Sequence, residues 1–191
     1  MSPSHPHKFR QADTRLAGFV RDRGGMAAVE FAFVLPIMLA VLALVGVLGQ
    51  ALAIADKVTA TARTVVDIVS RNASLSTTDM TTILNASAYT MTPYDATNLS
   101  IVVAEIQTDG GGNATVTWSA AAYSGTPLTV GSTFTLPAAM SVASATYVYG
   151  QVSYNYTPVV LTPALSQTIT LTDTAYFSPR LYATINYPNP N

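Results

Sequence analysis

"RDRGGMAAVEFAFVLP", residues 21–36, joins a charged segment to a long apolar one. Two glycines, Gly24 and Gly25, end the charged segment, and Glu30 follows five residues after Gly25. From Phe31 to Ala55 there are 25 residues without a formal charge. At about 1.5 Å per residue, a helix of that length crosses a hydrocarbon layer of about 30 Å with some tilt. This part of the sequence therefore predicts a membrane-spanning helix.

The charges on the two sides of this span differ in sign. Residues 1–25 hold five basic residues against Asp13 and Asp22, whereas residues 72–191 hold five acidic residues against Arg180. Because basic segments stay on the cytoplasmic side, we expect residues 1–25 in the cytoplasm and residues from about 56 onward outside it. The exported part has no basic patch to match a phosphate backbone, so we expect no nucleic-acid partner.

The composition also limits the chemistry that the exported part can perform. The chain has no cysteine, and its two histidines, His5 and His7, lie in the basic leader. Disulfides, thiolate metal sites, histidine triads and histidine-ligated zinc are therefore excluded from the main domain. No phosphate-binding loop or nucleophile elbow brackets the five acidic residues of that domain. We expect no catalytic residue, no metal site and no cofactor.

The helix is expected to continue beyond the membrane, to about residue 71. Apolar residues recur at spacings of three and four, which places them on one helix face: Val58, Ala62, Val65, Val66 and Val69. Two interpretations of this stripe remain open. It packs on the chain's own domain, or it packs against identical or related helices.

The rest of the chain predicts a small domain rich in β-structure. "STTDMTTILNASAY" (76–89) predicts one short helix with Ser76 as its N-cap. Strands are expected in "NLSIVVAEIQTD" (98–109), in "ATVTWSA" (114–120) with Val116 and Trp118 on one face, in "ATYVYGQVSYNYTPVVL" (145–161) and in "SQTITLTDTAYFSP" (166–179). Residues 120–141 are expected to form a loop. The predicted fold class is α+β, with a long N-terminal transmembrane helix that continues onto a small antiparallel sheet.

Two further features suggest functional roles beside plainer ones. Four tyrosines lie close together in one predicted strand, Tyr147, Tyr149, Tyr154 and Tyr156. They form either a surface that binds sugar or a partner, or cross-strand contacts within the sheet. Arg180 is the single basic residue after Arg71, and it pairs either with an acid of its own domain or with a neighbouring subunit.

The pattern of Gly25, "MAAVE" and Phe31 resembles the processing site of type IV prepilins. The longer string "RGGMAAVEFAFVLP" is similar to the N-terminus of TadE-like pseudopilins of tight-adherence pilus systems. The resemblance is strongest over residues 21–71. It is weaker in "GQVSYNYTPVVL" (150–161) and "ITLTDTAYFSPR" (169–180), which resemble the two late strands of that family. The family layout is also pilin-like.

The resemblance implies a processing mechanism. A prepilin peptidase would cut between Gly25 and Met26, next to the Glu30–Phe31 pair, so that Met26 becomes the new amino terminus. Glu30 would then pair with the terminal amine of a neighbouring subunit, because a charge in that layer requires a partner. The plainer alternative is that Glu30 lies at headgroup level at the start of a helix, where the helix dipole favours an anion, and that Gly24 and Gly25 form a flexible joint.

A second processing site is also conceivable. "ALA" (51–53) and "AIA" (53–55) match small-x-small patterns at which a signal peptidase cuts, after Ala53 or Ala55. The apolar run is longer than the usual signal-peptide core of about 7–15 residues, which argues against a secreted domain.

The expected organisation is a basic cytoplasmic leader (1–25), a transmembrane and juxtamembrane helix (26–71) and an exported β-rich domain (72–191). The expected function is that of a minor pilin-like subunit in the bacterial inner membrane, with its C-terminal domain periplasmic and possible incorporation into an extracellular pilus. Its expected partners are the inner membrane, prepilin peptidase, other pilin and pseudopilin subunits and the pilus assembly platform. The alternative is an uncleaved, single-pass exported binding or adhesin-like domain.

Overall fold

The computed structural model describes residues 23–158 and 167–188, and the chain divides into two compact units, Met1–Gly46 and Val47–Asn191. The predicted basic leader lies outside the described residues apart from its last three. The "VVL" end of the third predicted strand, residues 159–161, also lies outside them.

Helix α2 (Arg23–Ser70) contributes to both units. Its sequence is rich in alanine, leucine and valine, and Pro36 lies inside it. Alanine and leucine are strong helix formers, and the apolar side chains stabilise the helix where they are buried. The predicted helix of about residues 26–71 is thus observed with slightly earlier ends.

The apolar stripe on the second half of α2 packs against the sheet of its own unit. Its five residues are 0–1% exposed and belong to one core cluster: Val58, Ala62, Val65, Val66 and Val69. Burying a valine side chain stabilises a fold by at least about 1.5 kcal/mol. Of the two interpretations left open by the sequence, packing on the own domain is the one observed.

Helix α3 (Thr77–Ala88) begins at a complete capping box. The Asp79 backbone N–H donates to the Ser76 hydroxyl (3.1 Å), and the Ser76 backbone N–H donates to the Asp79 carboxylate (3.0 Å). The hydrogen bonds from Ser76, its hydroxyl first, lower the pKa of Asp79. Met80 and Leu84 face the core, and the predicted N-cap is confirmed.

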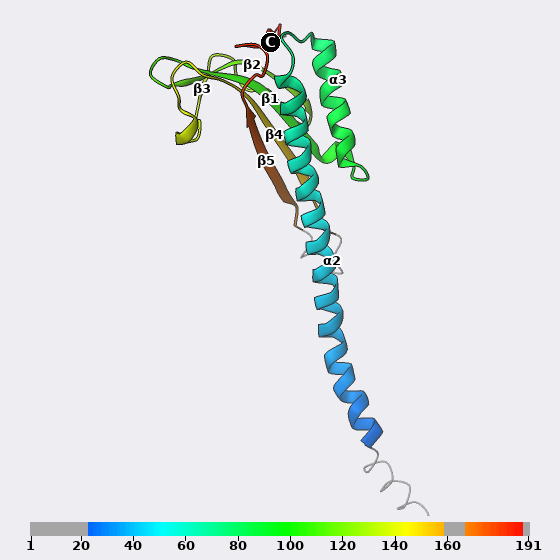
Figure 1. The fold of residues 1–191 in the computed structure, drawn as a ribbon. Helices are drawn as coiled ribbons and strands as arrows, with labels where there is room; N and C mark the ends of the chain where they lie inside the picture. Colours follow the sequence, from blue (N-terminus) through cyan, green and yellow to red (C-terminus); the bar gives the residue numbers. More distant parts are fainter. Residues whose placement is uncertain (1–22, 159–166, 189–191) are drawn as a thin grey trace, which may run out of the picture. The chain divides into compact units, whose positions relative to one another are not determined.

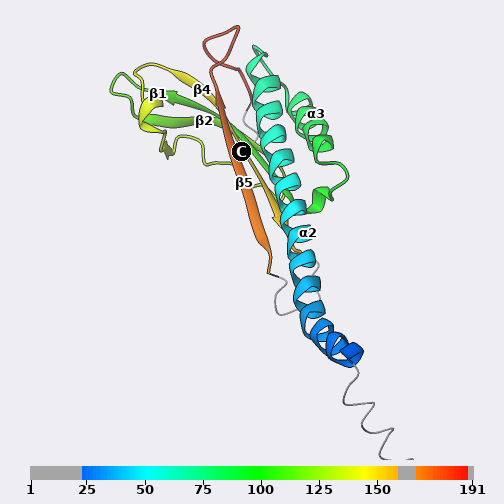
Figure 2. The same ribbon diagram turned by 60° about the horizontal axis from the view of Figure 1, so that its bottom comes forward.

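A five-stranded antiparallel sheet, in the order β3-β2-β1-β4-β5, completes the unit. The strands are β1 (Leu99–Thr108), β2 (Ala114–Tyr123), β3 (Thr133–Phe134), β4 (Thr146–Tyr156) and β5 (Ile169–Phe177). Short 3-10 turns lie between these elements, namely η1 (Tyr89–Met91), η2 (Ala96–Asn98) and η3 (Ala138–Met140). Figures 1 and 2 show that α3 and the second half of α2 lie side by side on one face of the sheet. The α+β class is therefore confirmed.

The helix approaches the sheet most closely at Gly150. A Cβ atom on Gly150 would lie 2.3 Å from Cγ2 of Val66 and 3.6 Å from the carbonyl oxygen of Ala62. Gly150 lies on β4, where it pairs with Val103 of β1 on one side and with Ala175 of β5 on the other. Its missing side chain is what lets α2 contact the middle of the sheet.

A β-bulge overturns the prediction that Val116 and Trp118 share a face. Glu105 pairs with Trp118, whereas the next residue, Ile106, pairs with Val116, so Thr117 is the extra residue. Since an extra residue shifts the alternation by one, Trp118 joins the core under the helices and Val116 joins the cluster on the opposite face.

The segment predicted as a loop, residues 120–141, is partly ordered in the sheet. β2 continues to Tyr123, and β3 and η3 follow within the segment. Leu136 packs against Ala104 and Ile106 on the face of the sheet that the helices do not cover. The prediction was wrong here because a two-residue strand carries no readable alternation.

Candidate processing and assembly segment

The four residues predicted for processing and assembly lie in the first turns of α2. They are Gly25, Met26, Glu30 and Phe31. Met26 and Glu30 are four residues apart, slightly more than one helical turn, so they lie on the same helix face. All four residues are exposed, Met26 to 68% and Phe31 to 59%. The helix therefore presents the predicted motif as one continuous surface.

Gly25 has no packing role in the structure. A Cβ atom built at Gly25 meets no atom within 4 Å, and the same holds for Gly46 later in the helix. Neither glycine is required for a close contact among the described residues. A requirement for glycine at position 25 would therefore have to come from outside the described residues.

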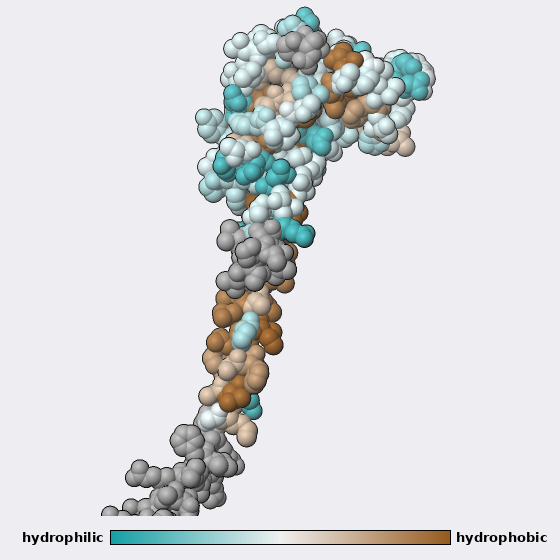
Figure 3. All heavy atoms as spheres, turned by 180° about the vertical axis from the view of Figure 1, so that it is seen from behind, coloured by the Kyte–Doolittle hydropathy of each residue, from teal (hydrophilic) through white to brown (hydrophobic). Residues whose placement is uncertain are grey.

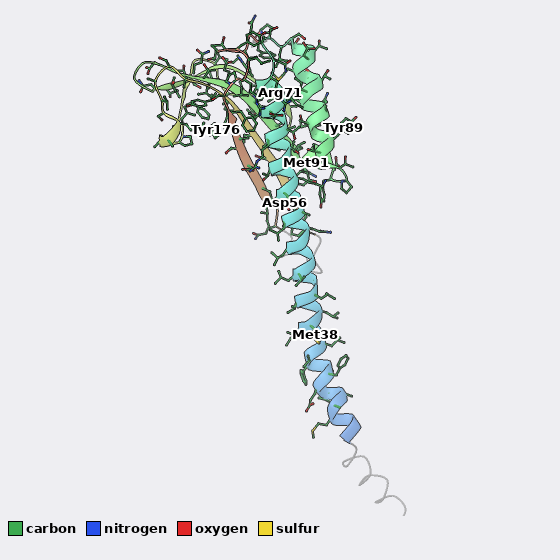
Figure 4. All side chains as sticks on the ribbon, in the orientation of Figure 1. Met38, Asp56, Arg71, Tyr89, Met91 and Tyr176 are labelled. Carbon is green, nitrogen blue, oxygen red and sulfur yellow. The ribbon has the colours of Figure 1, made fainter. Side chains whose placement is uncertain are left out.

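The apolar side chains of this segment are not buried by the protein. α2 is long and apolar enough to cross a membrane, and its best 18-residue window is 0% buried. Figure 3 shows the corresponding brown, hydrophobic surface along the helix, and Met38 extends from the helix in Figure 4. An exposed surface of this size marks a membrane or protein contact.

Glu30 is the only formal charge between Gly25 and Ala55. Within the part of the chain that the structure describes, no cationic side chain forms an ion pair with it; the two ion pairs found there both involve Asp67. Among the described side chains the carboxylate thus has no charge partner.

The tyrosine cluster divides between the two faces of the sheet. Tyr154 and Tyr156 belong to the core under the helices, and Tyr154 contacts Tyr94 edge-on with ring centroids 6.2 Å apart. Tyr147 and Tyr149 belong to the opposite cluster, where burial raises the pKa of Tyr149 to about 12. The cross-strand interpretation is therefore the one observed, since the four rings share no single surface.

Arg180 pairs with an acid of its own unit. Its guanidinium donates to the Asp67 carboxylate (2.7 Å), which also accepts from Arg71 one turn later on α2. The backbone N–H of Arg180 donates to the carbonyl oxygen of Ser70 (3.0 Å). These contacts join the chain after β5 to the end of α2.

Sequence reasoning missed the most buried charged group, Glu105. Its side chain is 0% exposed, and it accepts from the backbone N–H of Ile185 (2.7 Å) and from the Gln107 amide (2.9 Å). Burial raises its pKa, and these hydrogen bonds partly oppose the rise. The Trp118 indole donates to the carbonyl oxygen of Ile185 (2.9 Å). Glu105 therefore holds the C-terminal segment at Ile185. The sequence of β1 alone gave no sign of a hydrogen-bond partner 80 residues away.

A hollow of about 270 Å³ beside β3 does not have the features of a chemical site. It is lined by Phe134, Leu136 and residues of the loop before β2. Among residues 23–158 and 167–188, no three histidine, cysteine or acidic side chains gather to hold a metal ion.

Helix α2, with the apolar stripe on its second half, can now be compared with known protein families. Residues 25–67 match the model of the family described as TadE-like protein. Helix α2 is TadE-like. No curated protein and no solved structure matches the chain.

This match confirms the resemblance predicted from the N-terminal motif. The TadE-like segment covers the motif at Gly25 and runs to Asp67, so it includes most of the buried stripe. The match covers α2 and not the β-rich domain, and the matched helix is also the one that is long and apolar enough to cross a membrane.

Proposed function

We propose that this TadE-like chain is a minor pilin-like subunit, a pseudopilin, of tight-adherence pilus assembly, and that a prepilin peptidase cleaves it after Gly25. The observation that carries the proposal is the TadE-like match, which begins at Gly25 and continues along an unburied apolar helix. The fold also supports it, because a long helix packed on a small antiparallel sheet is the layout expected from the resemblance.

Cleavage requires the helical backbone around Gly25 to open. The peptidase hydrolyses the bond between Gly25 and Met26, so that water supplies a hydroxyl to the Gly25 carbonyl and a proton to the Met26 nitrogen. A backbone must be extended to lie in a protease cleft, and Gly25 adopts extended conformations without steric cost.

Cleavage also creates a cation at the start of the helix that carries Glu30. The new α-amino group of Met26 is cationic at neutral pH, with an ordinary pKa of about 7.7–8. A carboxylate near hydrocarbon is tolerated when it is paired, so Glu30 of one subunit pairs with the Met26 amine of the next. The absence of a charge partner for Glu30 among the described residues supports this pairing.

The proposed location is the bacterial inner membrane, with the leader in the cytoplasm and the domain in the periplasm before any incorporation into a pilus. The basic leader and the acidic domain support this orientation. The proposed partners are prepilin peptidase, other pilin and pseudopilin subunits and the assembly platform.

The fold argues against cleavage by signal peptidase. A cut after Ala55 would remove Ile54, which is 1% exposed in the core, together with Val47 and Ala51, which pack against the same cluster. The remaining domain would lose part of the helix that covers its sheet.

The deciding experiment is the N-terminal sequence of the mature protein from membranes of its native host. A start at Met26 is expected. An intact leader would instead favour an uncleaved membrane anchor with a binding domain, and a start at Ile54 or Asp56 would mean a secreted domain.

Two variants with matched controls test the residue roles. Gly25→Ala is expected to reduce cleavage, whereas Gly46→Ala, which also meets no atom within 4 Å, leaves it unchanged. Glu30→Gln keeps the size of the side chain and removes its charge, so cleavage proceeds but pilus assembly falls; Asp56→Asn is the control on the same helix. Full pilus formation by Glu30→Gln would refute the pairing.

A further inference from the structure

The hairpin of β4 and β5 extends past the rest of the sheet at one end. The first residue of β1, Leu99, pairs with Tyr154, so the next two pairs of the hairpin have no partner in β1. These pairs are Asn155 with Thr170 and Tyr156 with Ile169. We call these four residues the projecting end of the sheet.

The projecting end lies against α2. The Tyr156 hydroxyl donates to the side-chain oxygen of Gln50 (2.9 Å). Val47 and Ala51 pack against the core cluster to which Tyr156 belongs. Figures 1 and 2 both show β5 running beside this part of the helix. The contact is therefore specific, and it falls within the uncharged stretch of α2.

The position of Gln50 along α2 fits the far boundary of a membrane. The next formal charge after Glu30 is Asp56, and Gln50 is the first side chain after Glu30 that carries a strongly polar group. About 20 helical residues from Phe31 to Gln50 rise about 30 Å, the thickness of a hydrocarbon core. When Glu30 lies at one headgroup layer, Gln50 lies at the other.

The surface around the projecting end suits a headgroup layer. Ile169 is 46% exposed there, and at the same height on the face of α2 opposite Gln50 the side chains of Leu48 (54%) and Leu52 (68%) are exposed. The segments 153–157 and 167–172 contain no formal charge. The hydroxyl of Thr170 is also satisfied, because it donates to the Asn155 side-chain oxygen (2.8 Å).

Tyrosine beside exposed apolar side chains and an absence of charge is the composition found at membrane interfaces. The first formal charges beyond this region are Asp173 on β5 and Asp56 on α2. Figure 4 labels Asp56.

We propose that the projecting end of the sheet contacts the lipid headgroups of the bilayer that α2 spans. The inference rests on the proposed membrane-spanning role of α2 and adds a second contact between the chain and the membrane. The hydrogen bond between Tyr156 and Gln50 links the projecting end to the membrane-spanning helix, so the distance of the domain from the hydrocarbon layer is fixed.

The absence of native cysteine allows a direct test with single-cysteine variants. Leu42→Cys, Ile169→Cys and Val142→Cys are labelled with a nitroxide in the full-length chain, reconstituted in vesicles of phosphatidylethanolamine and phosphatidylglycerol. Leu42 (68% exposed) reports on the span, and Val142 (55% exposed) on the end of β1 opposite to Leu99. Accessibility to oxygen, which concentrates in lipid, is compared with accessibility to a water-soluble nickel chelate.

The expected oxygen-to-nickel ratio is highest at position 42, intermediate at 169 and lowest at 142. A label at 169 as accessible to nickel as the label at 142 would overturn the lipid contact while leaving the span intact. Low accessibility of position 169 to both reagents would mean that protein covers it, which overturns the assignment to lipid. A nickel-accessible label at position 42 would refute the span itself and, with it, the inference.

Thr168→Cys guards against damage to β5. Thr168 is exposed and precedes the strand, so its label should report the same environment as the one at position 169. The fluorescence of Trp118, the single tryptophan, which is 2% exposed, verifies the fold of each variant.

Discussion

Gly150→Ala should destabilise the domain although alanine is the most conservative replacement for glycine. The added methyl group would lie 2.3 Å from Cγ2 of Val66, much closer than two carbon atoms normally approach. Val66 cannot move away easily, because it is 0% exposed and is β-branched on a helix, which restricts its side chain to one favoured rotamer. Either the helix shifts away from the sheet or Val66 leaves its rotamer.

Two effects of opposite sign decide the magnitude. Overpacking a core costs about 1–3 kcal/mol, whereas replacing glycine by alanine stabilises by about 0.4–1 kcal/mol through the unfolded chain. The steric overlap is deep, so it outweighs the entropic gain. We expect a net loss of about 1–2 kcal/mol in the free energy of unfolding. With a urea slope of about 2 kcal/mol per molar, the unfolding midpoint falls by about 0.5–1 M.

Urea unfolding of the full chain in detergent, followed by the fluorescence of Trp118, measures this shift. Gly110→Ala is the control, because a Cβ atom there meets no atom within 4 Å. Val66→Ala alone should cost about 2 kcal/mol, since it removes buried methyl groups. In the double variant Gly150→Ala/Val66→Ala the two losses should not add, because the truncated Val66 leaves room for the new methyl group. The reasoning is refuted if Gly150→Ala matches the wild type or if the two losses are additive.

Three further predictions concern single contacts of the same domain. Burial raises the pKa of Glu105 above its ordinary value of 4.5, so the folded state binds a proton at this carboxyl group more tightly than the unfolded state does. The stability that this protonation contributes is present below the unfolded pKa and is lost as the pH rises through the folded pKa. The stability of the wild type relative to Glu105→Gln should therefore improve on acidification from neutral pH, and a constant difference in urea midpoint across that range would contradict this. Ser76→Ala should cost about 1 kcal/mol by removing the cap of α3, whereas Thr81→Ala within the same helix should be nearly neutral; equal urea midpoints for the two variants would argue against the capping box. Arg180→Ala should change the unfolding free energy by only about 0.5 kcal/mol or less, because the ion pair with Asp67 is largely exposed (53% and 27%), and a loss several times larger would show that this pair holds the C-terminal segment.

The long-period features of the fold could be predicted from the sequence. The stripe from Val58 to Val69 repeats at helical spacing over several turns, and burial follows directly from that pattern. The Ser76–Asp79 spacing likewise identifies the start of α3, because a capping box is formed by residues three apart in the chain. Local chemistry was sufficient in both cases.

Features that depend on distant partners could not be predicted. The bulge at Thr117 is defined only by pairing with β1, so the sequence of β2 alone placed Val116 and Trp118 on the same face. The sequence places Glu105 in a predicted strand but gives no sign that Ile185 supplies a backbone N–H to its carboxylate. Which surface the stripe of α2 covers also depends on Gly150, whose role appears only when the sheet is assembled.

For the candidate segment, the sequence supplied the motif and the structure supplied its surroundings. The residues Gly25, Met26, Glu30 and Phe31 are recognisable because they lie close together between a charged leader and an apolar run. The structure adds that Gly25 makes no close contact within the described chain and that Tyr156 contacts Gln50. No periodicity links Tyr156 to Gln50, since the two residues lie 106 positions apart.

The contact between Tyr156 and Gln50 also restricts insertions and deletions in α2. Gln50, Ile54 and Val58 face the sheet through one uninterrupted helical phase. One residue inserted between them would rotate the part of the helix on one side of the insertion by about 100° relative to the other part, and would displace it by about 1.5 Å along the axis. Either Gln50 would turn away from Tyr156, or the valine stripe would turn toward solvent. This part of the helix can therefore change in sequence more readily than in length.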